Sequence, residues 1–513
     1  MRVKKASINV MVNIVTFIIG YLPLFIVRRV FFQTLGNDYL GLTSLFDNII
    51  GYLSIMELGI GSAIVFSMYK PFAEGNKKKI KGYLDYYSKF YKITGLLILI
   101  LGMMILPFLK FFVKNKIDIT QVKYFFVLYL INTFISYLFS YKICILNVAQ
   151  EGYKVSIATT ISKLLIAILQ VWSFYINPSF YAYIIIQIIV NLIYYGCINF
   201  YINRKFDWIK HTKGSISKDE KSSLVNNIRA LFFHKIGYVF VASTDNLVIS
   251  SFISLSAVGT FNSYNMIISA LRRLIDTTIA SLTASIGNLL VEEDSNESYK
   301  VHKRLFFVNF WVVSFVIILL VNVIKQTVVI WLGKDQIIDN FTLTIILLNA
   351  YFAMMRNSVE SFKEAAGIFE QDKFSPLFEG GINLVSSIIL VKLIGLPGVF
   401  LGTLISNLTV VFWVKPKMVY KYVFKKPLKN YFYMYIKYLV ISLIPLSISY
   451  ILTSSIREVN TIGALILNCL INTITINIIY LFIFRNSEEF KYFKGLALNI
   501  FGKFNFKGIM GKA

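Results

Sequence analysis

An apolar run of about thirty residues, from Leu40 to Tyr69, most constrains what this chain can fold into. The run is too long for an ordinary globular helix and long enough to cross a bilayer. At 1.5 Å per residue, such a helix reaches roughly 45 Å, which exceeds the hydrocarbon core of a membrane. We therefore expect a membrane helix that tilts, projects or bends, and Gly51, Gly59 and Gly61 mark the places where it could bend.

The same stretch recurs weakly about 218 residues later in the chain. Leu40-Gly41 aligns with Val258-Gly259, and Phe46 aligns with Tyr264. A second pair, NVAQEGYK (147–154) and GIFEQDKF (367–374), has nearly the same offset. Weak internal symmetry on this scale is typical of transporter folds, so we interpret it as duplication of half of the protein.

Apolar segments of 20 residues and more follow one another along the 513-residue chain, in which 57% of residues are hydrophobic and 15% are charged. This balance excludes a soluble enzyme, because a soluble surface needs more charge. We predict an all-α polytopic membrane protein with fourteen spans. The spans are approximately 6–27, 40–69, 90–113, 122–146, 153–176, 179–203, 224–250, 258–290, 302–324, 341–366, 374–394, 397–418, 430–452 and 461–485.

The formal net charge of +26 would suggest nucleic acid in a soluble protein, but here it is distributed as membrane proteins distribute it. Lys and Arg concentrate in every second connection, which predicts cytoplasmic N- and C-termini and an even number of helices. The basic clusters near Lys77 and Lys425 would then face the anionic inner leaflet. The apolar N-terminal run is longer than a signal peptide core, so we expect it to be a retained first helix.

The repeat and the charge pattern together predict the domain organisation. We expect an N-terminal lobe of six helices at 1–203 and a polar cytoplasmic linker at 204–223. A C-terminal lobe of six helices would follow at 224–424, and residues 425–513 would form two extra helices and a basic tail. The lobes would surround a central cavity.

Ionisable residues inside spans are costly, so they usually line a cavity or pair with one another. Arg272 and Asp276 lie four residues apart on one helical face, and Arg356 and Glu360 repeat that spacing. One explanation is that half of each ladder neutralises the other half in structural ion pairs. The alternative is a water-filled cavity between the lobes, in which the cations hold an anionic headgroup. Candidate headgroup ligands are Arg272, Arg273, Lys235, Arg356, Lys163, Arg28 and Arg29. Candidate ion-coupling residues are Asp47, Glu57, Asp245, Asp276 and Glu360.

No catalytic or metal-binding constellation is visible in the sequence. His211 and His302 fall in predicted cytoplasmic loops, and His234 has no visible partner. The three cysteines lie within apolar segments, and no phosphate-binding loop is present. We therefore expect neither an enzyme nor a resident cofactor, although a Na⁺ or H⁺ gradient could drive transport.

Three segments carry a resemblance to a known family: 35–76, 234–252 and 374–406. Through them the chain resembles the Wzx-type polysaccharide flippases of the multidrug/oligosaccharidyl-lipid/polysaccharide exporter (MOP) superfamily. The resemblance implies two six-helix lobes with pseudo-twofold symmetry, two extra helices and a cationic lumen. It also implies translocation of undecaprenyl-diphosphate-linked oligosaccharide repeat units across the bacterial plasma membrane for capsule or cell-surface polysaccharide synthesis, with polymerases and glycosyltransferases as pathway partners.

Two other functions compete with this one as explanations of the sequence. A cation-coupled drug antiporter of the related multidrug branch would need carboxylates that face the cavity, whereas the deep cations here are at least as numerous. A polysaccharide polymerase or glycosyltransferase would need a sizeable catalytic loop, and the longest external connection has only about 16 residues.

Overall fold

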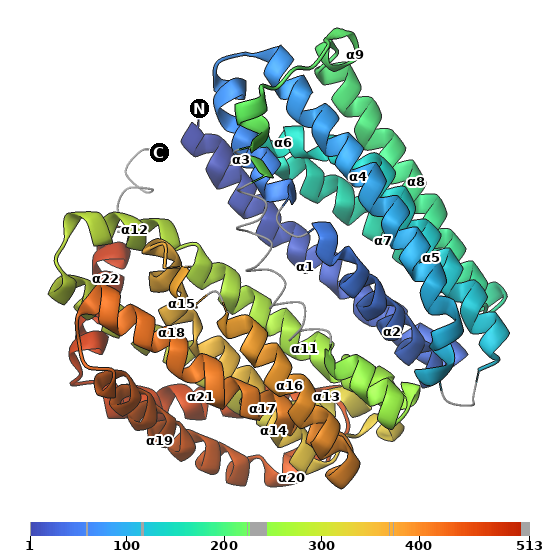
Figure 1. Cartoon of the computed structure of the whole chain (residues 1–513). Helices are drawn as coiled ribbons and strands as arrows, with labels where there is room; N and C mark the ends of the chain where they lie inside the picture. Colours follow the sequence, from blue (N-terminus) through green and yellow to red (C-terminus); the bar gives the residue numbers. More distant parts are fainter. Residues whose placement is uncertain are drawn as a thin grey trace, which may run out of the picture. The chain divides into compact units, whose positions relative to one another are not determined.

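The computed structural model describes residues 2–57, 60–113, 117–222, 224–225, 244–368, 370–372 and 374–503 (Figure 1). Every regular element in these ranges is a helix, as the sequence predicts. Eleven of the described helices are long and apolar enough to cross a membrane. The fold class is thus confirmed, while the count of fourteen spans stays a prediction.

The chain packs into two compact units. Unit 1 comprises residues 1–263 and 373–403, and unit 2 comprises residues 264–372 and 404–513. Two helices, α11 (Leu255–Ala280) and α17 (Leu396–Ser406), run from unit 1 into unit 2. The lobe boundaries expected from the sequence remain a prediction.

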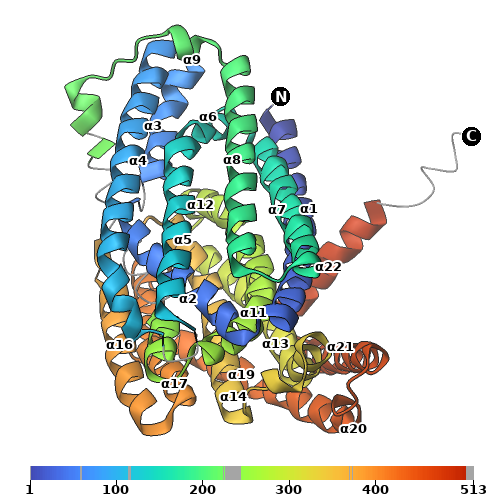
Figure 2. The same cartoon turned by 90° about the vertical axis from the view of Figure 1, so that its right-hand side faces the viewer.

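Unit 1 is built around the N-terminal helices. They are α1 (Arg2–Leu35), α2 (Asn37–Leu53), η1 (Ser54–Glu57), α3 (Ile60–Ala73), α4 (Lys77–Ile105), η2 (Leu106–Phe111), α5 (Ile119–Phe139), η3 (Ser140–Ile143), α6 (Cys144–Val148), α7 (Gly152–Ile176), α8 (Phe180–Lys205), α9 (Trp208–His211) and α16 (Ser375–Ile394). Helix α7 lies along α1 on one side and α8 on the other (Figure 2). The short connection between α7 and α8 ends in a helix cap. The Ser179 side chain accepts a hydrogen bond from the backbone amide of Ala182 at the start of α8.

The long apolar run at 40–69 is not one straight helix. Helix α2 ends at Leu53, the short 3-10 turn η1 follows, and α3 begins at Ile60. The break falls between Gly51 and Gly61, where the sequence predicts a bend. A Cβ at position 61 would lie 2.8 Å from the hydroxyl of Tyr87, so the glycine leaves room for a tyrosine of α4.

Helices α2 and α11 meet at two glycines that the internal repeat aligns. A Cβ on Gly41 would lie 1.9 Å from the carbonyl oxygen of Leu255, and a Cβ on Gly259 would lie 2.4 Å from Oδ1 of Asn37. The Asn37 amide nitrogen also donates to the carbonyl oxygen of Ser256 at 2.6 Å. Small residues allow this close approach of two helix backbones.

Unit 2 contains the remaining helices. They are α12 (Thr283–Glu292), α13 (Ser295–Leu332), η4 (Lys334–Gln336), α14 (Asn340–Met355), α15 (Asn357–Ala365), η5 (Glu370–Asp372), the π-turn η6 (Asn407–Val411), α18 (Phe412–Val419), the π-turn η7 (Tyr420–Phe424), α19 (Lys429–Leu452), α20 (Ser454–Arg457), α21 (Ile462–Phe484) and α22 (Glu488–Lys503). Helix α13 packs against α14, α19 and α21. The predicted span 341–366 is divided between α14 and α15 by a turn at Arg356.

A buried amide network holds the two extra helices, α19 and α21, to α13. The Asn322 side chain donates to Oδ1 of Asn472 at 2.7 Å and to Oγ of Ser449 at 3.1 Å. Asn472 in turn donates to Oδ1 of Asn468 at 2.7 Å, and Asn468 donates to Gln326 at 3.0 Å. Each member thus has a partner in an apolar setting where an unpaired amide would be costly.

The prediction of a loop at His302 is wrong, because this residue lies within a helix. Helix α13 begins at Ser295, after an N-cap in which Asp294 accepts hydrogen bonds from two backbone amides. His302 is fully buried and stacks against the ring of Phe424, with Tyr420 and Phe362 edge-on. The charged residues at 291–304 indicate a loop in the sequence, but those from Ser295 onward belong to the start of α13. The face of α13 that carries Ser298, His302 and Leu305 is buried.

Candidate functional site

A carboxylate in unit 1, that of Glu57, is surrounded by tyrosine hydroxyls. Tyr91 donates a hydrogen bond to Oε1, and Tyr137 donates to Oε2 at 2.5 Å. The Tyr87 hydroxyl donates to that of Tyr91 at 2.6 Å. These three rings come from α4 and α5, whereas Glu57 ends η1, so the break in the long apolar run is what turns the carboxylate toward them.

A second carboxylate in unit 1 belongs to a chain of polar side chains. The Thr403 hydroxyl on α17 donates to Oδ1 of Asp245 at 3.2 Å and accepts from the Asn383 amide of α16 at 3.2 Å. Ser387 donates to Oδ1 of Asn383 at 3.2 Å and to the carbonyl oxygen of Val399 at 2.9 Å. The arrangement gathers carboxylate, hydroxyl and amide oxygens, which are the ligand types that hard cations prefer.

Asp47 differs from these two carboxylates. Its side chain is exposed on α2, one turn before Gly51. The neighbouring faces of α2 bury Phe46 and Ile49 in the core of the unit. Asp47 therefore lies on the face of α2 that does not pack into this core.

In unit 2, the pair Arg272–Asp276 has the geometry that its spacing predicts. Nε of Arg272 lies 3.3 Å from Oδ2 of Asp276, and the Asn357 amide of α15 donates to Oδ1 of the same carboxylate at 2.6 Å. The side chains of the pair remain 41% and 40% exposed. Arg273 follows on α11 and is also exposed. Two guanidinium groups thus stay accessible at adjacent positions of a predicted membrane helix.

The Arg356 side chain has two partners and is less exposed than that of Arg272. Nε lies 3.0 Å from Oε1 of Glu360, and Nη1 donates to Oδ1 of Asn407 at 2.8 Å. Lys415 of α18 also donates to Glu360, so two cations neutralise this carboxylate. Lys363 forms its ion pair with Asp372 of η5. Arg356 and Glu360 thus form the ion pair that their spacing predicts.

The other described cations of the sequence-predicted set lie in unit 1. In Arg28, Nε donates to the Ser263 hydroxyl at 2.9 Å and Nη2 donates to the carbonyl oxygen of Gly259 at 2.8 Å. Arg29 and Lys163 are exposed on α1 and α7. Lys235 lies outside the described residues. Arg28 therefore acts as a link between α1 and α11.

The sequence marks the charged residues of the site but not the uncharged side chains that bind them. The three tyrosines around Glu57 and the Asn383–Thr403 pair come from distant segments and carry no charge that would mark them. Tyr87 and Tyr91 lie four residues apart on α4, and that spacing is the one local signal that could have found them. Across the described ranges, no cluster of three or more His, Cys, Asp or Glu side chains could hold a metal ion.

Comparison with solved structures shows the class of fold. The lipid II flippase MurJ, in an inward closed conformation, matches with a TM-score of 0.68 at 14% identity, over 93% of this chain and 99% of that chain. An inward-facing multidrug resistance MATE family transporter of the MOP superfamily matches with a TM-score of 0.65 at 14% identity, over 78% and 94%. A MOP superfamily transporter from Pyrococcus furiosus matches with a TM-score of 0.55 at 13% identity, over 82% and 97%.

The chain thus has the fold of the MOP-superfamily membrane transporters, as its sequence resemblance implies. These structural neighbours are transporters rather than enzymes. No family model and no curated protein sequence matches the chain.

Proposed function

We propose that this protein is a flippase that moves undecaprenyl-diphosphate-linked oligosaccharide repeat units from the inner to the outer leaflet of the bacterial plasma membrane. It works by alternating access, with both termini in the cytoplasm, and supplies capsule or cell-surface polysaccharide synthesis. Polymerases and glycosyltransferases of the same pathway are its functional partners.

The observation that carries the proposal is the match to a lipid II flippase over nearly the whole of both chains. The match covers 93% of this chain, against 78% for the multidrug transporter. The sequence resemblance at 35–76 and 374–406 points to the same branch. A diphosphate headgroup cannot cross hydrocarbon unaided because its desolvation is prohibitively costly, so such cargo requires a protein of this kind.

The headgroup ligands of first choice are Arg272 and Arg273. A guanidinium group matches phosphate oxygens in a bidentate way, and both side chains are accessible. Arg356 ranks below them because its side chain is only 17% exposed and its Nη1 already donates to Asn407. Lys163, Lys235 and Arg29 are secondary candidates, and Arg28 has a positioning role.

For coupling to a Na⁺ or H⁺ gradient we propose Asp245 and Glu57. Among the described residues, their partners are hydroxyl groups rather than cations. Asp276 and Glu360 each pair with arginine, which leaves less charge to attract a coupling ion. Asp47 is kept as a third candidate because its carboxylate is accessible.

Depletion of the protein in its host tests the proposal. Intact lipid-linked repeat units should accumulate on the inner leaflet and surface polysaccharide should be lost, and re-expression should reverse both effects. A double Arg272→Ala/Arg273→Ala variant should reach the membrane at normal levels yet fail to restore export. Unchanged lipid-linked intermediates after depletion would rule the flippase function out.

The second candidate function is a cation-coupled drug antiporter. It is favoured by the match to a multidrug transporter and by two carboxylates without cationic partners among the described residues. For this function, depletion should raise drug sensitivity and leave surface polysaccharide intact. The two functions therefore predict opposite results in one pair of measurements.

A further inference from the structure

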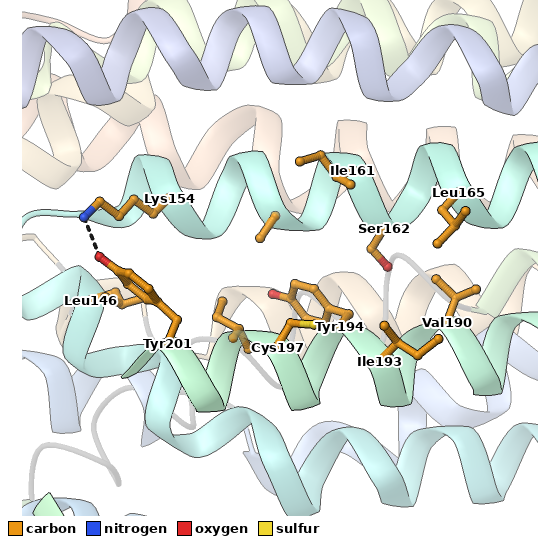
Figure 3. A pocket seen from close by; sticks show the side chains of 12 residues that line it. Leu146, Lys154, Ile161, Ser162, Leu165, Val190, Ile193, Tyr194, Cys197 and Tyr201 are labelled. Carbon is orange, nitrogen blue, oxygen red and sulfur yellow. Dashed lines mark hydrogen bonds between the residues drawn. The ribbon is translucent and has the colours of Figure 1, made fainter. Parts of the chain in front are cut away.

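A cavity of about 360 Å³ lies between α7 and α8 in unit 1 (Figure 3). Ile161 and Leu165 line it from α7, and Val190 and Ile193 line it from α8. The side chains of the two helices point toward one another across it (Figure 3). None of the residues that the proposed transport function uses lines this cavity.

The cavity opens on an apolar surface. Ile161 is 59% exposed and Ile193 is 52% exposed, and both belong to its lining. Along the same helices, Ile168 and Phe200 are also exposed. In a helix of a membrane transporter fold, such a surface faces acyl chains, so the cavity can be entered sideways from the bilayer.

One end of the cavity is polar and basic. Lys154, which lines it, donates to the Tyr201 hydroxyl at 2.6 Å (Figure 3). The same ammonium group lies 3.0 Å from Oε2 of Glu151. Lys205 pairs with the same carboxylate oxygen, and Arg204 precedes it at the end of α8. Two lysines share one carboxylate here, so this end retains net positive charge.

The depth of the cavity matches one leaflet of a membrane. From Lys154 to Leu165 the helix rises about 16 Å at 1.5 Å per residue. Half of a hydrocarbon core about 30 Å thick is close to that length. An occupant that places a charged group beside Lys154 would therefore extend its chain to about the middle of the bilayer.

We propose that the groove between α7 and α8 is a binding site for one anionic phospholipid, with an acyl chain in the cavity and the phosphate at Lys154 and Lys205. The apolar lining selects a hydrocarbon chain, and the basic end selects an anionic headgroup over a zwitterionic one. The site is independent of the cargo: it applies to the flippase and to the antiporter alike. The charge pattern of the sequence predicts that the Lys154 end faces the cytoplasm, where anionic lipids are abundant.

Photolabelling of the full-length protein tests the site. The protein is reconstituted in phosphatidylcholine bilayers that contain a trace of phosphatidylglycerol with a photoreactive acyl chain, and the labelled peptides are mapped by mass spectrometry. Label is expected in the segments 154–165 and 190–201. A phosphatidylcholine with the same photoreactive acyl chain should label these segments about fivefold less, the effect expected for one net positive charge near an anionic lipid.

Two variants with matched controls separate the parts of the site. Cys197→Trp fills the cavity from its exposed rim and should abolish labelling, whereas Ile189→Trp, on the exposed face of α8 outside the lining, should not. Lys154→Gln should remove the preference for phosphatidylglycerol. Lys89→Gln, which removes an exposed lysine from α4, should leave the preference unchanged.

Equal labelling by the two photoreactive phospholipids, or labelling spread evenly over the lipid-facing helices, would overturn the proposal. Displacement of the label by polyprenyl phosphate at a lower concentration than by phosphatidylglycerol would also overturn it, because the groove would then belong to a polyprenyl chain. All three outcomes are read from the same labelled peptides, and the transport assays do not affect them.

Discussion

Gly41 and Gly259, which the internal repeat places at equivalent positions, lie in one contact between α2 and α11. A Cβ at position 41 would overlap the backbone of Leu255 on α11. A Cβ at position 259 would overlap Asn37 on α2. The repeat therefore has a physical counterpart in unit 1, because both copies of the motif supply the small residue at the same helix contact.

Alanine at either glycine should destabilise the protein. A Cβ at position 41 overlaps backbone atoms, which cannot move as the end of a flexible side chain can, so we expect Gly41→Ala to lower the free energy of unfolding by about 1–3 kcal/mol. Gly196→Ala on α8 is the control, since nothing lies within 4 Å of its added Cβ. Thermal unfolding of the purified variants in detergent measures the difference, and equal midpoints would contradict the contact.

Arg28 and its neighbour Arg29 should respond differently to substitution by lysine. Arg28 directs two nitrogens to two acceptors on α11, and lysine cannot reproduce that fork. We expect Arg28→Lys to cost about 1–2 kcal/mol of stability. Arg29 is exposed, so Arg29→Lys should be neutral. Thermal unfolding followed in parallel for the two variants checks this, and a shift of equal size in both would exclude the linking role of Arg28.

The sequence predicted the features that depend on neighbouring residues. Membrane helices follow from long apolar runs, and the Arg272–Asp276 and Arg356–Glu360 pairs follow from a spacing of four residues. The bend in the 40–69 run follows from its glycines. Each of these properties is set within a few turns of one helix.

The partners that come from distant segments were not predictable in the same way. Lys363 forms an ion pair with Asp372, although Glu360 and Glu364 are closer to it in the sequence. The Glu57–Tyr137 hydrogen bond joins residues 80 positions apart, and a tyrosine in an apolar helix looks the same whether it faces lipid or a carboxylate. Single-sequence reasoning has no access to the packing that decides between those surroundings.

The amide network in unit 2 should be essential for docking α21. Asn472→Leu removes both a donor and an acceptor and leaves Asn322 with one partner fewer. Interhelical hydrogen bonds in membranes contribute about 0.6–2 kcal/mol, so the variant should lose about 1–2 kcal/mol of stability. Thr473→Val is the control, because the Thr473 hydroxyl is exposed and bonds only within its own helix, to Cys469. Destabilisation of the control by the same amount would argue against the network.

The ion pairs of Glu151, in the connection between α6 and α7, predict a pH dependence of stability. Burial raises the pKa of Glu151, but hydrogen bonds from Lys205 and Lys154 outweigh it and hold the pKa below its ordinary value. A lowered pKa stabilises the folded state above the pKa of the unfolded chain, and this stabilisation is lost as pH falls through the folded-state pKa.

Glu151→Gln should therefore be less stable than the natural protein at pH 7, by about 1 kcal/mol or less because the pair is partly exposed. The difference should shrink as pH falls below the ordinary range for glutamate, about 4.3, and should not grow at any lower pH. Unfolding midpoints measured between pH 3 and pH 7 test the sign. A difference that widens toward low pH would refute the ion-pair explanation.

Exchange of the charges of Arg272 and Asp276 separates a structural role of the arginine from headgroup binding. A single Arg272→Asp substitution places two carboxylates one turn apart, so it should both destabilise the protein and abolish export. Adding Asp276→Arg restores opposite charges on the same helical face and should recover most of the stability. Under the proposed function, export should stay lost in this double variant, because the guanidinium group is moved four residues, about 6 Å, along the helix and a carboxylate takes its former place. Unfolding midpoints and surface polysaccharide are measured on the same strains. Full recovery of export by the exchanged pair would mean that Arg272 serves only to neutralise Asp276, and the headgroup would then have to bind elsewhere.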